Sequence, residues 1–449
     1  MIDAASGPKM ITAYPGPQTR DLVERLRRVE GSGMRTAAEF PLVNIESANG
    51  VYIIDSDGNR YLDLYAGFAA ANIGHAHPQV TAAIQAQAAK LTHVSSAYVT
   101  STRVQLLEQL LSIAPTGLTR GLFAITGGQA NDLALRLARR ATNRDEFIAF
   151  HGGYFGRDAG VLGLNSKASF RRGFGVSPNA HFFPFPYAYR CPFGNHHTDP
   201  DECAQECLTY LENALHNPAA GMGDIAAMIL EPVQGNGGVT ISPKSFLPGL
   251  RRLCDQFGIL LIFDEIQSGF GRTGKMWAGE HWNVVPDLMT VGKGVGGGLP
   301  VSAVLGRAGA MSSLDAGQHT STFLTNALAH AAAIAALDVM IKENLCERSA
   351  QLGEVLHSSL SDELKEHPQV GEIRGLGLFI GIEIVKDRVT REPDPKLASR
   401  LMQQARDAGL ILGVSGYYNN VIKLAPPLII NHQQLEIAIE LLGNVFQRG

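Results

Sequence analysis

The feature that most limits the possible folds is an alternation of short apolar runs and helix-like segments between Gly121 and Val304. Continuous apolar runs are typical of strands that are buried on both faces of a sheet. The expected strands are Leu122–Ile125, Phe147–Phe150, Ile225–Leu230, Ile259–Phe263, Leu288–Val291 and Val301–Leu305. The expected helices between them are Asn131–Ala141, Asp201–His216 and Ser245–Phe257. This order predicts an α/β domain with a mainly parallel sheet that helices cover on both faces.

The chain changes character after an Ala-rich helix expected at Ala327–Ile341. Short strands and amphipathic helices then follow one another without the long apolar runs seen before. The expected elements are a helix at Arg348–Glu366, strands at Glu372–Arg374, Leu378–Val385 and Val421–Leu424, and a last helix from His432. This pattern indicates a separate, smaller α+β domain.

A hairpin is expected near the N-terminus, where Val51–Asp55 and Tyr61–Leu64 flank a run of turn-forming residues. We therefore expect three parts. Residues 1–80 form an N-terminal segment with the hairpin, which packs with the small domain. Residues 81–342 form the large α/β domain, and residues 343–449 form the small α+β domain.

Composition narrows the class of ligand. The chain has 449 residues, of which 45% are hydrophobic and 18% are charged, and its formal net charge is -4. It has no basic block of the kind that binds nucleic acid or an anionic membrane surface. No apolar run approaches the roughly 20 residues that a membrane span needs. Five cysteines in so long a chain favour a reducing compartment over a disulfide framework, so we expect a cytoplasmic protein with small-molecule ligands.

The chemistry of the chain is indicated by a carboxylate at a strand end and a lysine in a glycine-rich loop. The apolar run Ile259–Phe263 leads directly to Asp264, and Lys293 lies between glycines further along. A lysine amine forms a Schiff base with an aldehyde, and a buried carboxylate keeps a pyridine nitrogen protonated. These are the two groups that pyridoxal 5'-phosphate requires, so we expect that cofactor.

A phosphate site is expected where the strand Leu122–Ile125 passes into a helix. Gly127 and Gly128 lie at this junction, where free backbone N–H groups and the helix dipole attract an anion. Tyr154 follows the next strand, where its ring could lie on the cofactor ring, although a tyrosine in the protein core remains an alternative. Thr322 offers a hydroxyl to the phosphate, with a surface loop residue as the alternative.

With these residues in place, nearly the whole chain resembles a class III (ω-type) aminotransferase of pyridoxal-phosphate fold type I, the aspartate-aminotransferase-like fold. The family motifs occur here as Gly74–Pro78, Glu231–Gly235, Asp264–Gln267, Gly271–Ala278 and Pro286–Gly294. The resemblance implies an enzyme that moves an amino group from an amine or amino acid to a 2-oxo acid by a ping-pong mechanism. It also implies a homodimer with shared active sites.

The resemblance assigns roles to individual residues. Lys293 forms the Schiff base and shuttles the proton, and Asp264 binds the pyridine nitrogen. Gln267 lies near the ring hydroxyl, and Tyr154 stacks on the ring. Gly127 and Gly128 hold the phosphate within one subunit, and Thr322 reaches that phosphate from the partner subunit.

The sequence departs from the family pattern at two linked positions. Glutamate-using members carry an arginine that clamps a carboxylate, and this chain has Lys423 in Asn420–Leu428 instead. Lysine keeps the charge but loses the bidentate fork. The glutamate that pairs with this arginine in many members is Asn236 here. A lysine that snorkels along apolar surface is the alternative interpretation of Lys423.

Two rival functions are considered. The first is an amino-acid racemase or epimerase on the same fold, and the segment Gly371–Pro393 resembles both groups and does not decide between them. Such enzymes carry an aspartate as a second acid or base where this chain has Asn236, and an amide cannot carry that proton. A cofactor-binding regulator is the other rival, but the chain has no additional DNA-binding motif.

Two further signals are weaker. Phe68 falls where related enzymes line the substrate pocket, and a core phenylalanine is the alternative. Cysteines and histidines gather in one segment, which raises the question of a zinc site. They are Cys191, His196, His197, Cys203 and Cys207. Their spacing lacks a paired Cys-x2-Cys knuckle, so we expect buried thiols in a solvent-facing insertion and no metal.

Overall fold

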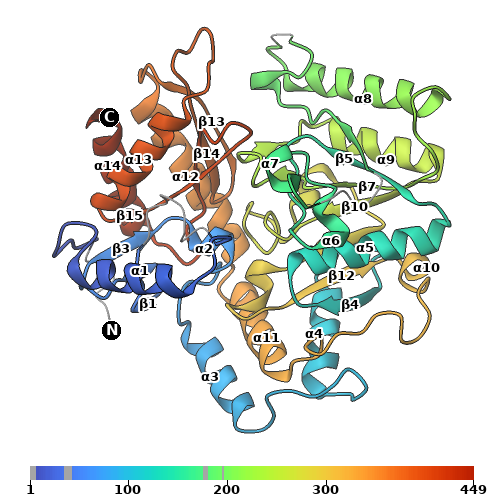
Figure 1. Cartoon of the computed structure of the whole chain (residues 1–449), viewed down its shortest axis with the longest axis horizontal. Coiled ribbons are helices and arrows are strands. Elements are labelled where there is room, and N and C mark those ends of the chain that lie inside the picture. Colours follow the sequence, from blue (N-terminus) through green and yellow to red (C-terminus); the bar gives the residue numbers. More distant parts are fainter. Residues whose placement is uncertain (1–6, 35–42, 175–179, 195–196, 449) are drawn as a thin grey trace.

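The computed structural model describes residues 7–34, 43–174, 180–194 and 197–448. Its centre is a seven-stranded sheet with the order β4-β12-β11-β10-β7-β5-β6 (Figure 1). The strands are β4 (Arg120–Ala124), β5 (Glu146–Phe150), β6 (Ala180–Phe183), β7 (Ile225–Leu230), β10 (Leu260–Asp264), β11 (Leu288–Val291) and β12 (Ser302–Gly306). Strand β12 is antiparallel to both of its neighbours, and the other pairs in this sheet are parallel. The predicted α/β fold with a mainly parallel sheet is confirmed.

Alternate residues of the central strands face two helical layers, as the period of a strand requires. In β5, Phe147 and Ala149 belong to the same apolar cluster as the buried face of α5. Ile148 and Phe150 belong to the cluster formed by α8 and α9 on the opposite face. These helices are α5 (Gly127–Thr142), α8 (Pro200–His216) and α9 (Phe246–Phe257). The sheet is therefore buried on both faces, which is why its strands read as continuous apolar runs.

The structure differs locally from the predicted elements at an edge strand and at the start of a helix. The edge strand β6 was not predicted, because Ala180–Phe183 contains a histidine and is only partly buried. Helix α5 begins at Gly127 and not at Asn131. The reason is that the Thr126 side chain accepts a hydrogen bond from the Gln129 backbone N–H (3.2 Å) and caps the helix four residues earlier.

The C-terminal part contains an antiparallel four-stranded sheet with the order β13-β14-β17-β16. Apolar side chains of α12, α13 and α14 belong to the same core cluster as this sheet. The elements are α12 (Leu345–Leu364), β13 (Val370–Leu376), β14 (Phe379–Ile384), α13 (Pro395–Asp407), β15 (Leu410–Ile411), β16 (Gly413–Ser415), β17 (Val421–Leu424) and α14 (His432–Arg448). The long helix α11 (Ala327–Lys342) leads into this part from the large sheet.

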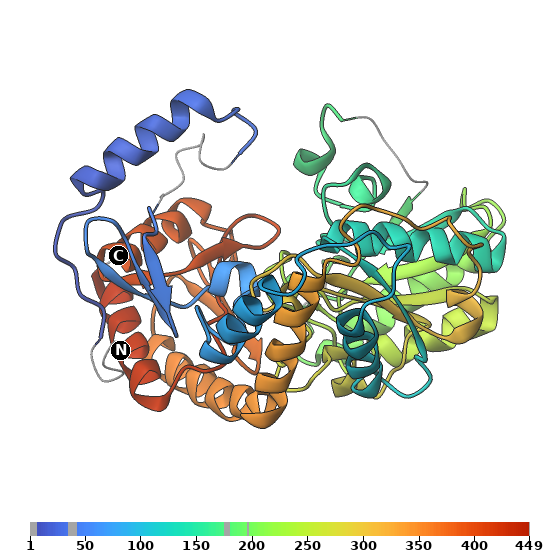
Figure 2. The same cartoon turned by 90° about the horizontal axis from the view of Figure 1, so that it is seen from below.

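The N-terminal strands join the C-terminal part. The expected hairpin is β2 (Tyr52–Ile54) and β3 (Arg60–Asp63), and β3 pairs in parallel with β15. In Figures 1 and 2 the first and last parts of the chain accordingly lie together on one side of the seven-stranded sheet. The exact division of the chain at residues 80 and 342 stays a prediction.

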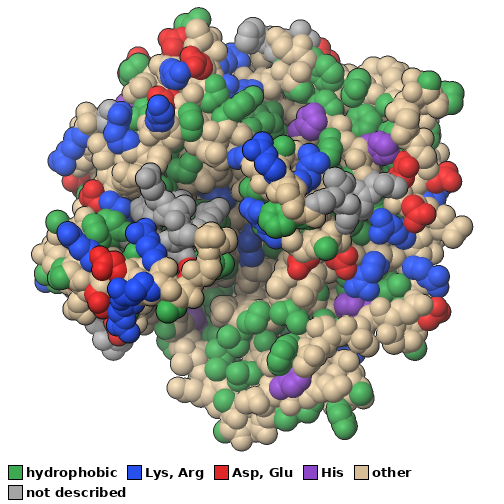
Figure 3. Space-filling model, viewed as in Figure 1, with side chains coloured by type: hydrophobic (Ala, Val, Ile, Leu, Met, Phe, Trp, Pro, Cys, Tyr) green, Lys and Arg blue, Asp and Glu red, His purple; other side chains and the backbone are tan. Residues whose placement is uncertain are grey.

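The remaining elements connect and cover these sheets. The helices are α1 (Pro17–Val29), α2 (Ala66–Ala69), α3 (Pro78–Ala88), α4 (Ser101–Ser112), α6 (Ala159–Leu162), α7 (Ala168–Arg171), α10 (Ala308–Met311), η2 (Ala188–Arg190), η3 (Ala278–Trp282) and η4 (Lys293–Gly296). The short strands are β1 (Ser47–Asn49), β8 (Val233–Gln234) and β9 (Thr240–Ile241). Among the described residues, no helix has both the length and the apolar character needed to cross a membrane. Acidic and basic side chains are interspersed over the face in Figure 3.

Candidate active site

The candidate residues gather at one edge of the seven-stranded sheet, where strands β4, β5, β7, β10 and β11 end. These five strands run in the same direction. The residues at or just beyond their ends are, in chain order, Gly127, Gly128, Tyr154, Glu231, Asp264, Gln267 and Lys293. Ligands of open α/β sheets bind outside the carboxyl ends of the strands for this reason, since several loops meet there.

A cavity of about 410 Å³ lies at this edge. Its lining contains six residues that the sequence singled out: Gly127, Gly128, Tyr154, Asp264, Gln267 and Lys293. It also contains residues to which the sequence analysis gave no role, among them Asn131, Gly156, Arg157, Asp158 and Glu231. The volume and the mixed polar and apolar lining suit a small cofactor.

Asp264 is held in a fixed orientation at the end of β10. Its side chain accepts hydrogen bonds from Asn131 Nδ2 (2.7 Å) and from the Ile266 backbone N–H (2.9 Å). Asn131 is oriented in turn, because Thr290 Oγ1 donates to its side-chain oxygen at 2.8 Å. Burial raises the pKa of Asp264, and the Asn131 and Ile266 hydrogen bonds and the Lys293 charge oppose this rise. A cation in the cavity would favour the ionised form further.

Lys293 opens the short helix η4 directly after β11. Its backbone has a φ of 48°, in the left-handed region that is uncommon for residues other than glycine. Burial lowers the pKa of the Lys293 amine, and the charges of Asp264 and Glu231 partly offset this effect. A neutral amine is the form that attacks an aldehyde, so this environment suits Schiff-base chemistry.

Glu231 is a member of the site whose role the sequence analysis did not assign. Its carboxylate accepts hydrogen bonds from the backbone N–H groups of Tyr154 (3.0 Å) and Gly235 (2.9 Å). Burial and the charge of Asp264 raise the pKa of Glu231. The sequence signal was the motif Glu231–Gly235. It singles out Glu231 but does not indicate that its carboxylate accepts hydrogen bonds from both the Tyr154 loop and Gly235.

The phosphate end of the cavity is the beginning of helix α5. The helix has 16 residues and no acidic residue in its first turn. Neither Gly127 nor Gly128 carries a side chain that would cover the backbone N–H groups, and Arg157 lies in the same lining. Backbone N–H groups at a positive helix end, a neighbouring arginine, a buried carboxylate and a lysine amine together fit pyridoxal phosphate.

Four other candidate residues do not line this cavity. Phe68 is 40% exposed, so the alternative of a core phenylalanine is wrong. Its carbonyl accepts a hydrogen bond from Gln267 Nε2 (2.9 Å), which connects it to the site through the backbone. Thr322 is exposed in the loop before α11, and Asn236 is half-buried with its carbonyl bonded to the Gly416 N–H (3.0 Å).

Lys423, the fourth of these residues, lies on β17 and is 2% exposed. Its Nζ donates to the Gly235 carbonyl (3.4 Å) and lies near the rings of Tyr65 and Phe379. The alternative of a lysine that snorkels to solvent is therefore wrong, because the ammonium group itself is buried.

The chain matches the family model described as aminotransferase class-III over residues 34–446. Among curated relatives, an alanine/serine racemase from Pyrococcus horikoshii is 36% identical over 442 residues, which cover 97% of this chain and 92% of that protein. The 5-aminovalerate aminotransferase DavT from Pseudomonas aeruginosa is 37% identical over 424 residues, with 94% and 97% covered.

Solved structures agree with the sequence relatives. An (S)-enantioselective omega-transaminase from Thermomicrobium roseum matches with a TM-score of 0.87 and 28% identity, and the match covers 96% of this chain and 98% of that chain. The family model spans nearly the whole chain, and the solved transaminase shares its fold over nearly the full length. The chain therefore belongs to the class III aminotransferase family and is a pyridoxal-phosphate-dependent transaminase of fold type I.

Proposed function

We propose that the chain transfers an amino group from an amine or amino acid to a 2-oxo acid in two half-reactions, with Lys293 and Asp264 as its catalytic residues. The observation that carries this proposal is their shared cavity at the strand ends, where each changes the pKa of the other. A racemase would need a second acid or base, and Asn236 carries an amide and lies outside the cavity lining.

Each lining residue would have one task. Bound pyridoxal phosphate supplies an aldehyde that condenses with amines and a ring that withdraws electrons from the substrate carbon. Asp264 would keep the proton on the pyridine nitrogen, and Lys293 would hold the cofactor and then move the substrate proton. Tyr154 and Gln267 would position the ring, and the N–H groups of Gly127, Gly128 and their neighbours would bind the phosphate.

At Lys423 the substrate side would carry a weaker carboxylate anchor than the arginine that the resemblance implies for glutamate-using members. Lys423 provides a single ammonium group in place of a planar guanidinium, and this group already donates to the Gly235 carbonyl. Such an anchor binds a carboxylate weakly compared with a bidentate fork. We infer a donor whose binding does not depend on an α-carboxylate, and Phe68 would contribute an apolar surface near its amine.

A homodimer is part of the proposal. Thr322 belongs to a loop that lies beside another exposed loop, since Thr325 Oγ1 donates to the Val94 carbonyl (3.1 Å). The two loops expose large apolar side chains, namely Tyr98, Val99 and Phe323. An exposed apolar patch of this kind is typical of a protein interface. Thr322 would then reach the phosphate in the partner subunit.

The compartment is inferred from the cysteines. None of the five forms a disulfide; three are buried and two are half-buried. Free thiols persist in reducing compartments. We infer a cytoplasmic enzyme.

The decisive experiment follows one half-reaction. The holoenzyme is mixed with primary amines, ω-amino acids and α-amino acids without an acceptor, and the released cofactor is separated by chromatography. Conversion of pyridoxal phosphate to pyridoxamine phosphate, reversed by a 2-oxo acid, is the expected result. If the cofactor stays unchanged while an enantiopure amino acid racemises, the aminotransferase proposal fails and the racemase takes its place.

A further inference from the structure

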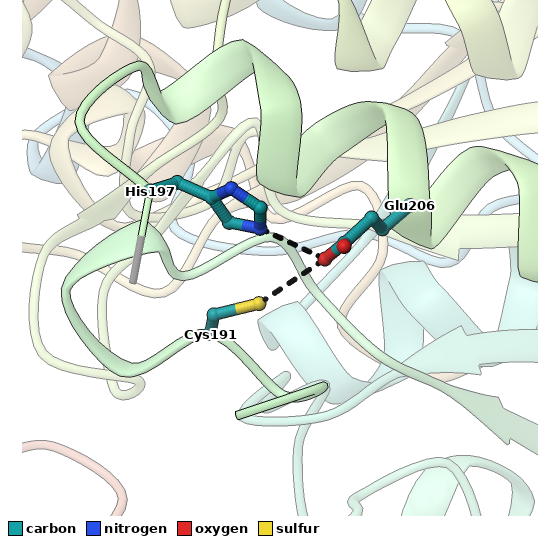
Figure 4. Close-up of side chains that lie close together, drawn as sticks. All are labelled: Cys191, His197 and Glu206. Carbon is teal, nitrogen blue, oxygen red and sulfur yellow. Dashed lines mark hydrogen bonds and ion pairs between the residues drawn. The ribbon is translucent and has the colours of Figure 1, made fainter. Parts of the chain in front are cut away.

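Three potential metal ligands converge where the segment after η2 meets helix α8. Cys191 and His197 come from this segment, and Glu206 comes from the second turn of the helix (Figure 4). One ligand atom of each residue lies within 4.8 Å of the other two. None of the three residues lines the cavity that contains Lys293. The cluster is therefore separate from the cofactor site.

The distances fit a small metal ion. Glu206 Oε2 lies 2.9 Å from His197 Nε2 and 3.5 Å from Cys191 Sγ. Around a tetrahedral zinc ion with bonds of 2.0–2.3 Å, neighbouring ligand atoms are about 3.4 Å apart. Small side-chain movements would bring all three atoms to that separation.

A second observation concerns the far side of the imidazole. Glu202 Oε2 lies 3.0 Å from His197 Nδ1, so the ring is bonded on both of its nitrogens. A carboxylate that accepts from one ring nitrogen orients the ring, and the other nitrogen can bind a metal once it has lost its proton. Residues 202 and 206 lie one helical turn apart on α8, which explains how one helix face supplies both carboxylates.

The surroundings allow a metal to enter and hold it there. A surface depression includes His197, Glu202 and Glu206 in its lining. On the inner face of α8, Cys203 is fully buried in the apolar core that the helix covers. Soft thiolate combined with imidazole is a donor set that selects zinc over magnesium or calcium.

We propose that Cys191, His197 and Glu206 bind a zinc ion that fastens the segment after η2 to helix α8. Three protein ligands are sufficient to hold zinc, with water in the fourth position. Binding releases to solvent both the thiol proton of Cys191 and the proton shared between His197 Nε2 and Glu206, and it gives the ion two anionic ligands. The sequence marked Cys191 and His197 among its candidate ligands but not Glu206, and without a paired Cys-x2-Cys knuckle it favoured no metal. The candidate His196 lies outside the described residues.

The test measures zinc binding by the full-length holoenzyme. The protein is freed of metal by chelation and titrated with Zn²⁺ against a chromophoric zinc indicator. We expect one zinc per chain in the native protein and no such binding in C191S or H197A. The variant E202Q should bind roughly ten- to a hundred-fold more weakly, because the imidazole loses its orienting carboxylate.

The matched control is C346S, since Cys346 is also half-buried and free but lies outside the cluster. It should bind zinc like the native chain. Transaminase activity of each variant, measured without zinc, verifies that it folds. Substitution of Co²⁺ should give a thiolate-to-metal absorption band that disappears in C191S. Absence of zinc binding in the native chain, or native-like zinc affinity in C191S and H197A, would overturn the proposal.

Discussion

At the scale of single residues, Asn131 connects three parts of the candidate site, although its position in the sequence indicates no such role. It donates to both Asp264 and the Phe155 carbonyl and accepts from Thr290. Without Asn131, the Asp264 carboxylate would lose a hydrogen bond that lowers its pKa, and burial would still raise that pKa. The charge of Asp264 thus depends on a residue 133 positions away in the chain.

We predict that Asn131→Ala lowers kcat by roughly ten-fold or more, since loss of a buried hydrogen bond to a charged group costs about 1.5–3 kcal/mol. Steady-state kinetics and the cofactor dissociation constant provide the measurement. The control is Asn420→Ala, a buried asparagine outside the cavity lining. It should reduce stability without this loss of kcat. Equal kcat for both variants would contradict the role of Asn131.

His330 on α11 predicts a pH dependence of stability. Burial lowers the pKa of its imidazole from 6.5 to about 4, and Nδ1 has no hydrogen-bond partner among the described residues. Between these pH values the unfolded chain binds a proton that the folded chain does not. The stabilisation is therefore complete above pH 6.5 and is lost as the pH falls towards 4.

Over this window the loss amounts to roughly 3 kcal/mol. We expect His330→Gln to flatten the corresponding part of the curve of unfolding free energy against pH. Urea unfolding at several pH values provides the measurement. An unchanged slope in the variant would mean that His330 does not titrate in this way.

At the scale of elements, the contact between α5 and the loop after β5 shapes the phosphate end of the cavity. Gly156 has a φ of 114°, and a Cβ there would lie 2.6 Å from the Cα of Gly128. The backbone of Gly128 cannot move aside to relieve this contact as a flexible side chain could. A residue larger than glycine would push the loop away from the helix N-terminus.

We predict that Gly156→Ala weakens binding of pyridoxal phosphate by about ten-fold or more, which corresponds to roughly 1.4 kcal/mol of lost phosphate contacts. Equilibrium dialysis with the free cofactor provides the measurement. The control is Gly309→Ala, because a Cβ at Gly309 meets nothing within 4 Å. It should bind the cofactor normally. Normal binding by both variants would contradict the close approach.

At the scale of the whole molecule, the question is whether each site needs two chains. If Thr322 serves the partner subunit, a mixed dimer of Lys293→Ala and Thr322→Ala chains has one site with both native residues. We predict that the mixture is more active than the mean of the two separate variants. Lys293→Ala mixed with the native chain is the control and should give the simple average. An average value for the double mixture as well would mean that the sites are not shared.

Much of the fold was predictable because it follows from local patterns. Strands β7, β11 and β17 have the predicted bounds, since a continuous apolar run next to a turn is defined by adjacent residues. The edge strand β6 was missed because partial burial removes that signal. In the candidate site, the six predicted residues of the cavity lining were marked by glycines, charges or motifs. Their individual roles stay predictions.

The sequence by itself determined the fold class and the family, and it singled out six residues of the cavity lining, because periodicity and motif spacing act over short stretches of chain. Only the tertiary structure decided which distant residues meet. The strand order brings Asn131 to Asp264 and Glu231 to the Tyr154 loop, and the path after η2 brings Cys191 to Glu206. Such contacts depend on how elements pack across the sheet and on the course of loops, and no spacing along the chain encodes those distances.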